Sequence, residues 1–326
     1  MPTRKGSIFL FRLFGVSVYL HYSWFLIALL QIYLVRGSGA TFSGHAQPIP
    51  YHILLYLCLF LIVLIHEFGH SLACKSVGGK SDTIVLFPFG GVSYVQPPQR
   101  AGAMLWSIAA GPLVNVVLLP VTIVPLVLLH AYPLFGSLST VGTDLLTDIA
   151  GINAMLLFFN ILPVYPLDGG QILRSLLWFI SGRAISLLIA ASIGLACTIL
   201  GVITALVFGD WWLAAVAGFL AMQAWVGLKY GQMYLRLERA PRHADAQCPH
   251  CHEHPPAVPM WQCKCGNSFD LFAHQGHCPA CAATIRVAPC PYCEERAALE
   301  KWYEPAVPPI VLPPSWAEGQ PRVRPT

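Results

Sequence analysis

The stretch LFLIVLIHEFGHSLACK, residues 59–75, places three ionisable side chains inside an apolar segment. The apolar run begins near Tyr51, so a helix built from it is long enough to cross the roughly 30 Å hydrocarbon core of a bilayer. His66, Glu67 and His70 lie in its last third. An ionisable residue inside a membrane span is costly and marks a functional site. We therefore expect a membrane protein with a polar site within its helices.

The composition of the whole chain agrees with this expectation. Of its 326 residues, 56% are apolar and only 10% charged, whereas about 25% are charged in an ordinary soluble domain. This deficit excludes a disordered protein and argues against a soluble enzyme with a solvated surface. The fold class expected is an all-α polytopic membrane protein with a small membrane-associated β-hairpin. About six transmembrane helices are predicted, at residues 18–35, 51–73, 104–130, 145–162, 184–208 and 210–234.

The distribution of charged residues and of cysteines divides the chain into two parts. Residues 1–240 contain seven acidic residues, whereas residues 241–326 contain the other eight and eight of the eleven cysteines. We predict a six-span membrane domain at residues 1–240, a small cytosolic Cys₄ zinc-ribbon domain at 244–300 and a proline-rich disordered tail at 301–326.

The predicted loops also differ in positive charge. Lys and Arg gather before the first span, between the second and third, between the fourth and fifth, and after the sixth, whereas the opposite loops offer only Arg36. Because cytoplasmic loops carry the excess of Lys and Arg, both termini are expected in the cytosol. Paired cysteines in the tail fit that reducing compartment. The expected location is a bacterial cytoplasmic membrane.

The spacing of the two histidines indicates a metal site. His66 and His70 are four residues apart and so face the same side of a helix, where both imidazoles can bind one ion. Glu67 is rotated by about 100°, where it can take a proton from a metal-bound water. This is the zincin arrangement of HExxH. The alternative is a pair of histidines that merely pack within a helix bundle, which would leave Glu67 as an unpaired buried acid.

A catalytic zinc needs a third protein ligand and an open position. Asp168 and Asp82 are the acids within reach on the cytosolic side. Asp168 follows Pro163 and Pro166, which hold an extended segment, and precedes a glycine pair that allows a tight turn. The residues alone leave two roles open for Asp168, a metal ligand or a helix N-cap.

These motifs together resemble the site-2 protease family of intramembrane zinc metalloproteases. The resemblance covers most of residues 8–235, and two departures from common family patterns leave its regulation open: no PDZ-like insertion and no CBS-like tail. The motifs that carry it are HEFGH (66–70), GPLVN (111–115), NILPVYPLDGG (160–170), FPFGGV (87–92) and GVSVYLHYSW (15–24).

The resemblance implies a role for each matching residue. His66, His70 and Asp168 would bind the catalytic zinc, with Glu67 as general base. Asn160 would steady the substrate carbonyl or the transition state. Asn115 would grip the substrate backbone. For each of these two amides, the alternative is a hydrogen bond to a neighbouring helix.

The segment 81–95 is expected to form a hairpin that turns at Gly90–Gly91. A strand edge beside the zinc can bind an unwound substrate in extended form, so Gly90 and Gly91 are predicted to lie in the substrate-binding region. The alternative is a surface hairpin with no part in substrate binding.

The tail carries four close cysteine pairs, which supply the thiolates of two tetrahedral Cys₄ sites. We expect two structural zinc ions there, because so small a domain has little core of its own. Sequential pairing is predicted, with a cross-braced alternation of pairs as the alternative. The sequential sites would be Cys248, Cys251, Cys263 and Cys265, then Cys278, Cys281, Cys290 and Cys293.

The function predicted is an intramembrane zinc endopeptidase that acts on membrane-protein substrates, single-span or other, in regulated intramembrane proteolysis. The tail is expected to bind a cytosolic protein partner. No nucleic acid is expected, because only Lys264, Arg286 and Arg296 supply positive charge in residues 244–300. One alternative is a catalytically inactive membrane scaffold that keeps the metal site and recruits partners through the tail. A metal transporter is the other, but its polar residues should recur in several spans.

Overall fold

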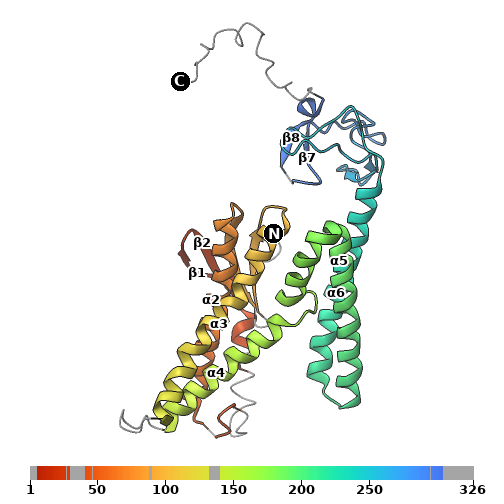
Figure 1. The fold of residues 1–326 in the computed structure, drawn as a ribbon. Helices are drawn as coiled ribbons and strands as arrows, with labels where there is room; N and C mark the ends of the chain where they lie inside the picture. Colours follow the sequence, from red (N-terminus) through yellow and green to blue (C-terminus); the bar gives the residue numbers. More distant parts are fainter. Residues whose placement is uncertain are drawn as a thin grey trace, which may run out of the picture. The chain divides into compact units, whose positions relative to one another are not determined.

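The computed structural model of the chain divides into two compact units, Met1–Tyr234 and Leu235–Thr326, which are considered separately here. The first unit consists of long helices and one sheet (Figure 1). The structure describes residues 6–26, 28–29, 41–45, 47–87, 90–131, 140–293 and 295–303.

Five of the described helices have the length and apolar composition needed to cross a membrane. They confirm the five predicted spans between residues 51 and 234. Most bounds are shifted by a few residues, but the helix of the span predicted at 184–208 already begins at Asp168. For the remaining span, predicted at 18–35, residues 18–21 are strand instead, residues 23–26 and 28–29 are helical, and residues 27 and 30–35 lie outside the described part. The helices are α2 (Ile49–Ser76), α3 (Ala101–Ala131), α4 (Thr140–Ile161), α5 (Asp168–Val207) and α6 (Trp211–Arg239).

Two of these helices depart from simple regularity. Three prolines lie inside α3, yet it runs as one helix, because neighbouring helices can satisfy freed backbone groups in a membrane protein. The 40-residue α5 is two helices joined at Gly182, whose φ of 80° and ψ of 173° are not helical. The second part, from Arg183 to Val207, contains most of the span predicted at 184–208.

A four-stranded sheet packs on α2. It consists of β1 (Ser7–Leu13), β2 (Val16–His21), β3 (Lys80–Phe87) and β4 (Gly90–Gln96), in the order β1-β2-β3-β4. β2 and β3 are parallel, and the two outer pairs are antiparallel. Val18, Ile84 and Leu86 from the sheet share a buried cluster with Leu64 and Phe68 of α2. The sheet therefore lies against the helix that carries the HExxH motif.

The expected hairpin is present as β3–β4, but two details of that prediction were wrong. Gly90 and Gly91 do not form the turn; they begin β4, where they pair with Phe87 and Leu86. The turn falls at residues 88–89, outside the described part. The hairpin is also half of a larger sheet, because the chain before α2 supplies two more strands.

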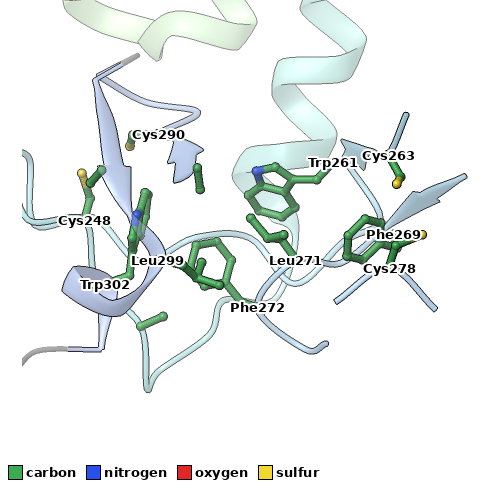
Figure 2. Close-up of a cluster of buried hydrophobic side chains, with 13 residues drawn as sticks. Cys248, Trp261, Cys263, Phe269, Leu271, Phe272, Cys278, Cys290, Leu299 and Trp302 are labelled. Atoms are coloured by element: carbon green, nitrogen blue, oxygen red, sulfur yellow. The ribbon is translucent and has the colours of Figure 1, made fainter. Parts of the chain in front are cut away.

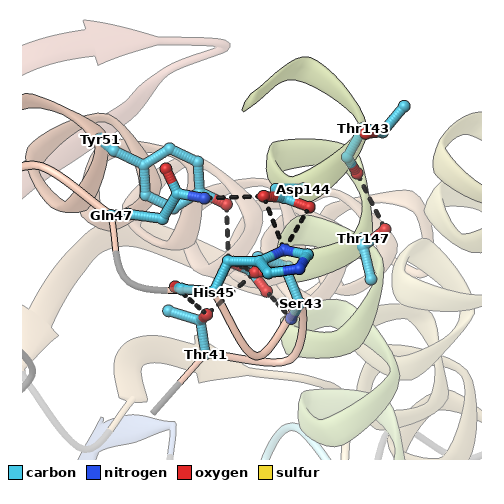
Figure 3. A network of polar contacts seen from close by, with 9 residues as sticks. Thr41, Ser43, His45, Gln47, Tyr51, Thr143, Asp144 and Thr147 are labelled. Carbon is cyan, nitrogen blue, oxygen red and sulfur yellow. Dashed lines mark hydrogen bonds and ion pairs between the residues drawn. The ribbon is translucent and has the colours of Figure 1, made fainter. Parts of the chain in front are cut away.

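A buried carboxylate ties the chain before α2 to α4. Asp148 is fully buried and accepts hydrogen bonds from the Ser43 backbone N–H at 2.6 Å, the Ser43 hydroxyl at 3.3 Å and the Tyr51 hydroxyl at 2.6 Å. Asp144 accepts a bond from Gln47 Nε2 at 2.7 Å (Figure 3). Asp148 lies inside a predicted span, and these three hydrogen-bond donors compensate for the burial of its carboxylate.

The second unit packs around an aromatic core. Trp261, Leu271, Phe272 and Trp302 are buried together (Figure 2). Its secondary structure is sparse: β5 (Trp261–Gln262) pairs with β6 (Ser268–Phe269), β7 (Val287–Pro289) pairs with β8 (Arg296–Ala298), and the 3₁₀ helix η3 spans Leu299–Trp302. Because Trp302 is part of the core, the folded region extends past the boundary predicted at residue 300. Residues 304–326, most of the predicted disordered tail, lie outside the described part.

Candidate metal centre and active site

The two histidines of α2 lie as their spacing predicts. His66 and His70 are both buried, and their Nε2 atoms are 3.1 Å apart. Glu67, the residue between them that is expected to act as base, is buried as well. The residues around them on α2 are apolar, as expected for a membrane helix. The helical repeat places His66 and His70 on the same face of this helix.

Helix α3 holds the second nitrogen of each imidazole. His66 Nδ1 donates to Asn115 Oδ1 at 3.0 Å, and His70 Nδ1 donates to the Ser107 carbonyl at 2.9 Å. A carbonyl can only accept, so each Nδ1 carries the hydrogen and each Nε2 is left with its lone pair. Metal-binding histidines are oriented in this way by neighbouring acceptors.

Asp168 completes a triangle of candidate ligand atoms. Its Oδ2 lies 3.1 Å from His66 Nε2 and 3.2 Å from His70 Nε2. Ligand atoms about 2.0–2.1 Å from a tetrahedral zinc ion are about 3.3 Å apart, so the three atoms have the spacing that zinc requires. Asp168 is the first residue of α5, whose N-cap position is occupied by Leu167 without a side-chain cap. The alternative role as an N-cap is therefore not the one seen.

Two glycines bring α2 and α3 close enough to form the triangle. A Cβ at Gly69 of α2 would lie 2.8 Å from the Ala110 carbonyl oxygen. A Cβ at Gly111 of α3 would overlap the His70 imidazole and lie 2.8 Å from His66 Nε2. A side chain at position 111 would therefore collide with the imidazoles that form the triangle. Two imidazole nitrogens and one carboxylate oxygen are a donor set typical of catalytic zinc.

The other predicted site residues are placed less directly. Asn115 is fully buried and bonded to His66, so its described contact is with a histidine. Asn160 is half-buried in the last turn of α4, and no described contact joins it to the three candidate ligands. Gly90 and Gly91 lie in β4, one of the two edge strands of the sheet, and β4 contacts α2. Asp82, the other acid considered as a ligand, is exposed on β3.

Three residues with a part in this geometry were missed. Ser107 contributes only a carbonyl, which carries no signal in a sequence. Gly111 opens the GPLVN motif, but only the packing of α3 on α2 gives it a purpose. Asn153 of α4 is fully buried and donates to the Asn115 carbonyl at 2.9 Å; an amide inside an apolar span was its only signal.

The eight tail cysteines form two groups, and the sequential pairing predicted for them was wrong. Within each group one ligand atom per residue lies within 4.8 Å of the others. The arrangement is nested, because the first pair joins the fourth and the second joins the third, so the cross-braced alternative is wrong too. The outer group is Cys248, Cys251, Cys290 and Cys293, and the inner group is Cys263, Cys265, Cys278 and Cys281.

Sulfur distances in both groups fit a zinc ion better than disulfides. The Sγ atoms of Cys263 and Cys281 in the inner group are 3.5 Å apart, and those of Cys251 and Cys290 in the outer group are 3.6 Å apart. Thiolates about 2.3 Å from a tetrahedral zinc ion lie about 3.8 Å apart, whereas a disulfide needs about 2.05 Å. Figure 2 shows Cys248 and Cys290 on one side of the aromatic core and Cys263 and Cys278 on the other.

One thiol of each group is prepared to ionise. Burial raises the pKa of Cys278, but hydrogen bonds from the backbone N–H groups of Ala280 and Cys281, together with those from the Cys263 and Cys265 thiols, lower it to about 6. The pKa of Cys248 is lowered in the same way by N–H groups of its CPHC turn, again against the effect of burial. Because a metal is bound by the thiolate, these turns favour the ligating form.

Comparison with known proteins places this geometry in a family. The sequence profile of peptidase family M50 matches residues 54–143 and 139–204, which include all three candidate ligands. The solved structure of a site-2 protease from Methanocaldococcus jannaschii aligns with 68% of this chain and 95% of its own, at 30% identity and a TM-score of 0.51. The chain belongs to peptidase family M50, the site-2 protease family.

Curated relatives agree with that assignment. A putative zinc metalloprotease from Synechocystis is 31% identical over 246 residues, which cover 69% of this chain and 61% of the relative. A zinc metalloprotease from Methanocaldococcus jannaschii is 35% identical over 188 residues, covering 58% of this chain and 50% of the relative. The chain thus spans about half to three fifths of the length of these relatives.

Proposed function

We propose that this chain is a zinc metalloendopeptidase that hydrolyses a peptide bond within or near a transmembrane segment of another membrane protein. The observation that carries the proposal is the triangle of His66 Nε2, His70 Nε2 and Asp168 Oδ2 beside a buried Glu67. Apolar membrane helices carry these groups, so the substrate reached most directly is one that shares the bilayer.

Each residue has a part in the proposed chemistry. His66, His70 and Asp168 would hold the zinc, which supplies Lewis acidity and lowers the pKa of a water molecule. Glu67 would take the proton of the attacking water and pass it to the leaving amine. Asn115 would keep the His66 ring oriented through its 3.0 Å bond, a positioning role in place of the substrate contact expected for it.

The remaining residues would handle the substrate. Asn160 would donate a hydrogen bond to the substrate carbonyl as negative charge develops on it. The edge strand β4, which begins at Gly90–Gly91 and contacts α2, would pair with an unwound substrate segment. Pairing of this kind exposes a peptide bond that a helix would shield with its own hydrogen bonds.

The location and the tail complete the proposal. The distribution of Lys and Arg supports cytosolic termini in a bacterial cytoplasmic membrane, and cleavage there would serve regulated intramembrane proteolysis. The two cysteine groups would bind structural zinc and hold a module that recruits a cytosolic protein. The small positive charge of that unit supports a protein partner over a nucleic acid.

Zinc content of the purified full-length chain tests the centre without a known substrate. With one ion in each of the three ligand groups, the wild-type chain is expected to hold three zinc ions, and Asp168→Asn two. Asp82→Asn, which alters an exposed acid outside the groups, should retain three. Three zinc ions in Asp168→Asn would overturn the assignment of the centre.

The variant Glu67→Gln distinguishes an active enzyme from the catalytically inactive scaffold. It should keep three zinc ions but allow uncut membrane proteins to accumulate in cells, measured by proteomics of the membrane fraction. Full cellular function in Glu67→Gln would instead favour the inactive scaffold.

A further inference from the structure

The loop that joins α4 to α5, residues 162–167, is enclosed by glycines of three helical segments. A Cβ at Gly170, in the first part of α5, would overlap the backbone of Tyr165. A Cβ at Gly194, in the second part of α5, would lie 2.8 Å from the Tyr165 nitrogen, and one at Gly227 of α6 would overlap the Tyr165 ring. Tyr165 therefore contacts three helical segments through glycines, at points where a side chain would displace it.

Helix α6 carries none of the candidate ligands, but it packs closely on the second part of α5 (Figure 1). Arg183 Nη2 donates to the Tyr234 hydroxyl at 3.2 Å, and a Cβ at Gly231 would lie 2.9 Å from the Leu188 side chain. Small residues allow membrane helices to pack closely, and the residues that α6 buries are Ala217, Ala224, Gly227 and Gly231. The contact of α6 with Tyr165 thus belongs to an interface that also fixes α6 on α5.

Tyr165 lies three residues before Asp168, the third candidate ligand, and hydrogen bonds join the loop to the helix that Asp168 begins. Gln171, in the first turn of α5, donates from Nε2 to the Pro166 carbonyl at 3.1 Å and from its backbone N–H to the Leu167 carbonyl at 3.0 Å. A shift of Tyr165 would therefore move the Asp168 carboxylate as well. Distances from ligand atoms to zinc vary by only about 0.2 Å, so even a small shift would weaken binding.

We propose that Tyr165 is a positioning residue of the metal centre, and that α6 acts on the centre through it. Its backbone lies against Gly194 and its ring lies against Gly227. Both helices thereby fix the place at which Asp168 enters the triangle, whereas α3 orients the two histidines. The ligands are thus held by two pairs of helices, α2 with α3 and α5 with α6, and the zinc affinity depends on both pairs. This role rests on the proposed zinc centre.

The test measures the zinc affinity of the purified full-length chain in a non-ionic detergent, by competition with a chelator that changes colour. The same titration of Asp168→Asn identifies the two ions of the tail, so the third ion can be followed separately. Tyr165→Ala removes the ring and should weaken binding of the third ion about tenfold or more, as for other partners that orient a ligand. Tyr165→Phe keeps the ring and should keep the wild-type affinity.

Gly227→Ala tests the part of α6. Its new Cβ would displace the ring, so it should weaken binding of the third ion when Tyr165 is present. In Tyr165→Ala the space is free, and Gly227→Ala should then have no further effect, as expected for two residues that act through one contact. Gly201→Ala is the matched control on the same interface, because a Cβ there meets only the Ala217 Cβ at 3.6 Å. It should bind zinc like the wild type.

The outcomes separate this role from the zinc centre itself. Two zinc ions in the wild-type chain would overturn the centre and this role with it. Three ions in the wild type and equal affinity in Tyr165→Ala would overturn the role alone, and so would additive effects of Tyr165→Ala and Gly227→Ala. If Tyr165→Ala does not fold, Tyr165→Leu decides, since it fills space without a ring: weaker binding at an unchanged unfolding temperature supports the proposal, and unchanged affinity overturns it.

Discussion

At the scale of single residues, the candidate centre depends on atoms that α3 brings to α2. The Ser107 carbonyl and the Asn115 amide oxygen fix which nitrogen of each histidine carries the hydrogen. Partners of this kind orient a ligand, and losing one typically costs about 10–100-fold in metal affinity. The metal affinity of the centre is therefore expected to depend on α3 as well as on the HExxH motif.

Gly111→Ala tests whether the space beside the histidines is needed. The new Cβ would overlap the His70 imidazole, so zinc content should fall by one ion per chain while the helices stay folded. Gly218→Ala is the control, since nothing lies within 4 Å of a Cβ there. It should keep all zinc and gain up to about 1 kcal/mol in stability, because alanine favours a helix. Full zinc in Gly111→Ala would show that the space is not part of the centre.

The sequence made part of this centre predictable. His66 and His70 could be paired because the helix period links residues four apart. Asp168 lies 98 residues after His70, and the residues around it left a capping role equally open; only the family resemblance favoured a ligand. Ser107 could not be found at all, because its contribution is a backbone carbonyl whose position depends on how α3 packs.

At the scale of elements, helices were predicted better than their connections. Transmembrane helices can be recognised as long apolar runs in the sequence, because the thickness of the bilayer sets their length. The β3–β4 hairpin was recognised, but its turn was placed two residues late because glycines were taken as turn residues. The parallel pairing of β2 with β3 joins segments on either side of α2, and no local pattern encodes such a contact.

The polar contacts of α4 lead to a stability prediction. In Asp148→Asn the new NH₂ group cannot accept, so at least one buried donor from Ser43 or Tyr51 loses its partner. We expect a loss of about 2–3 kcal/mol in the free energy of unfolding in detergent. Asp210→Asn is the matched control: Asp210 is exposed and accepts the Leu213 N–H at 2.9 Å at the start of α6, and asparagine caps a helix equally well. An equal effect of both substitutions would contradict the prediction.

Pairs of cysteine substitutions test the nested arrangement of the tail. Cys248 and Cys263 belong to different groups, so Cys248→Ser with Cys263→Ser should remove two zinc ions per chain. Cys248→Ser with Cys290→Ser alters one group only and should remove one. Sequential pairing would give the opposite result for both double variants, so zinc analysis distinguishes the two arrangements directly.

At the scale of the whole molecule, the two units are stabilised in different ways. The first consists of apolar helices, whereas the second has very short strands and a small aromatic core. A strong chelator should therefore unfold the second unit and leave the helices intact. Limited proteolysis should then cut between residues 241 and 303, with little change in helical circular dichroism. A protease-resistant tail without zinc would show that its core suffices.

The composition of the chain predicted a membrane domain and a cysteine-rich domain, but the end of the second domain could be located only in the structure. Trp302 lies only two residues past the predicted end of the tail domain, in a segment whose prolines indicated disorder. Its burial against Phe272 reflects a tertiary contact, which composition does not report.

The nesting of the cysteine groups has a consequence for synthesis on the ribosome. All four inner ligands are present once Cys281 has emerged, within a loop of residues 263–281, whereas the outer set waits for Cys293 and closes a loop from residue 248. Short loops cost less entropy to close, so we expect the inner group to bind its metal first and to bring the outer pairs together. Assembly of the tail would then proceed from the inside outward, and a chain truncated after Ala282 should already hold its inner metal.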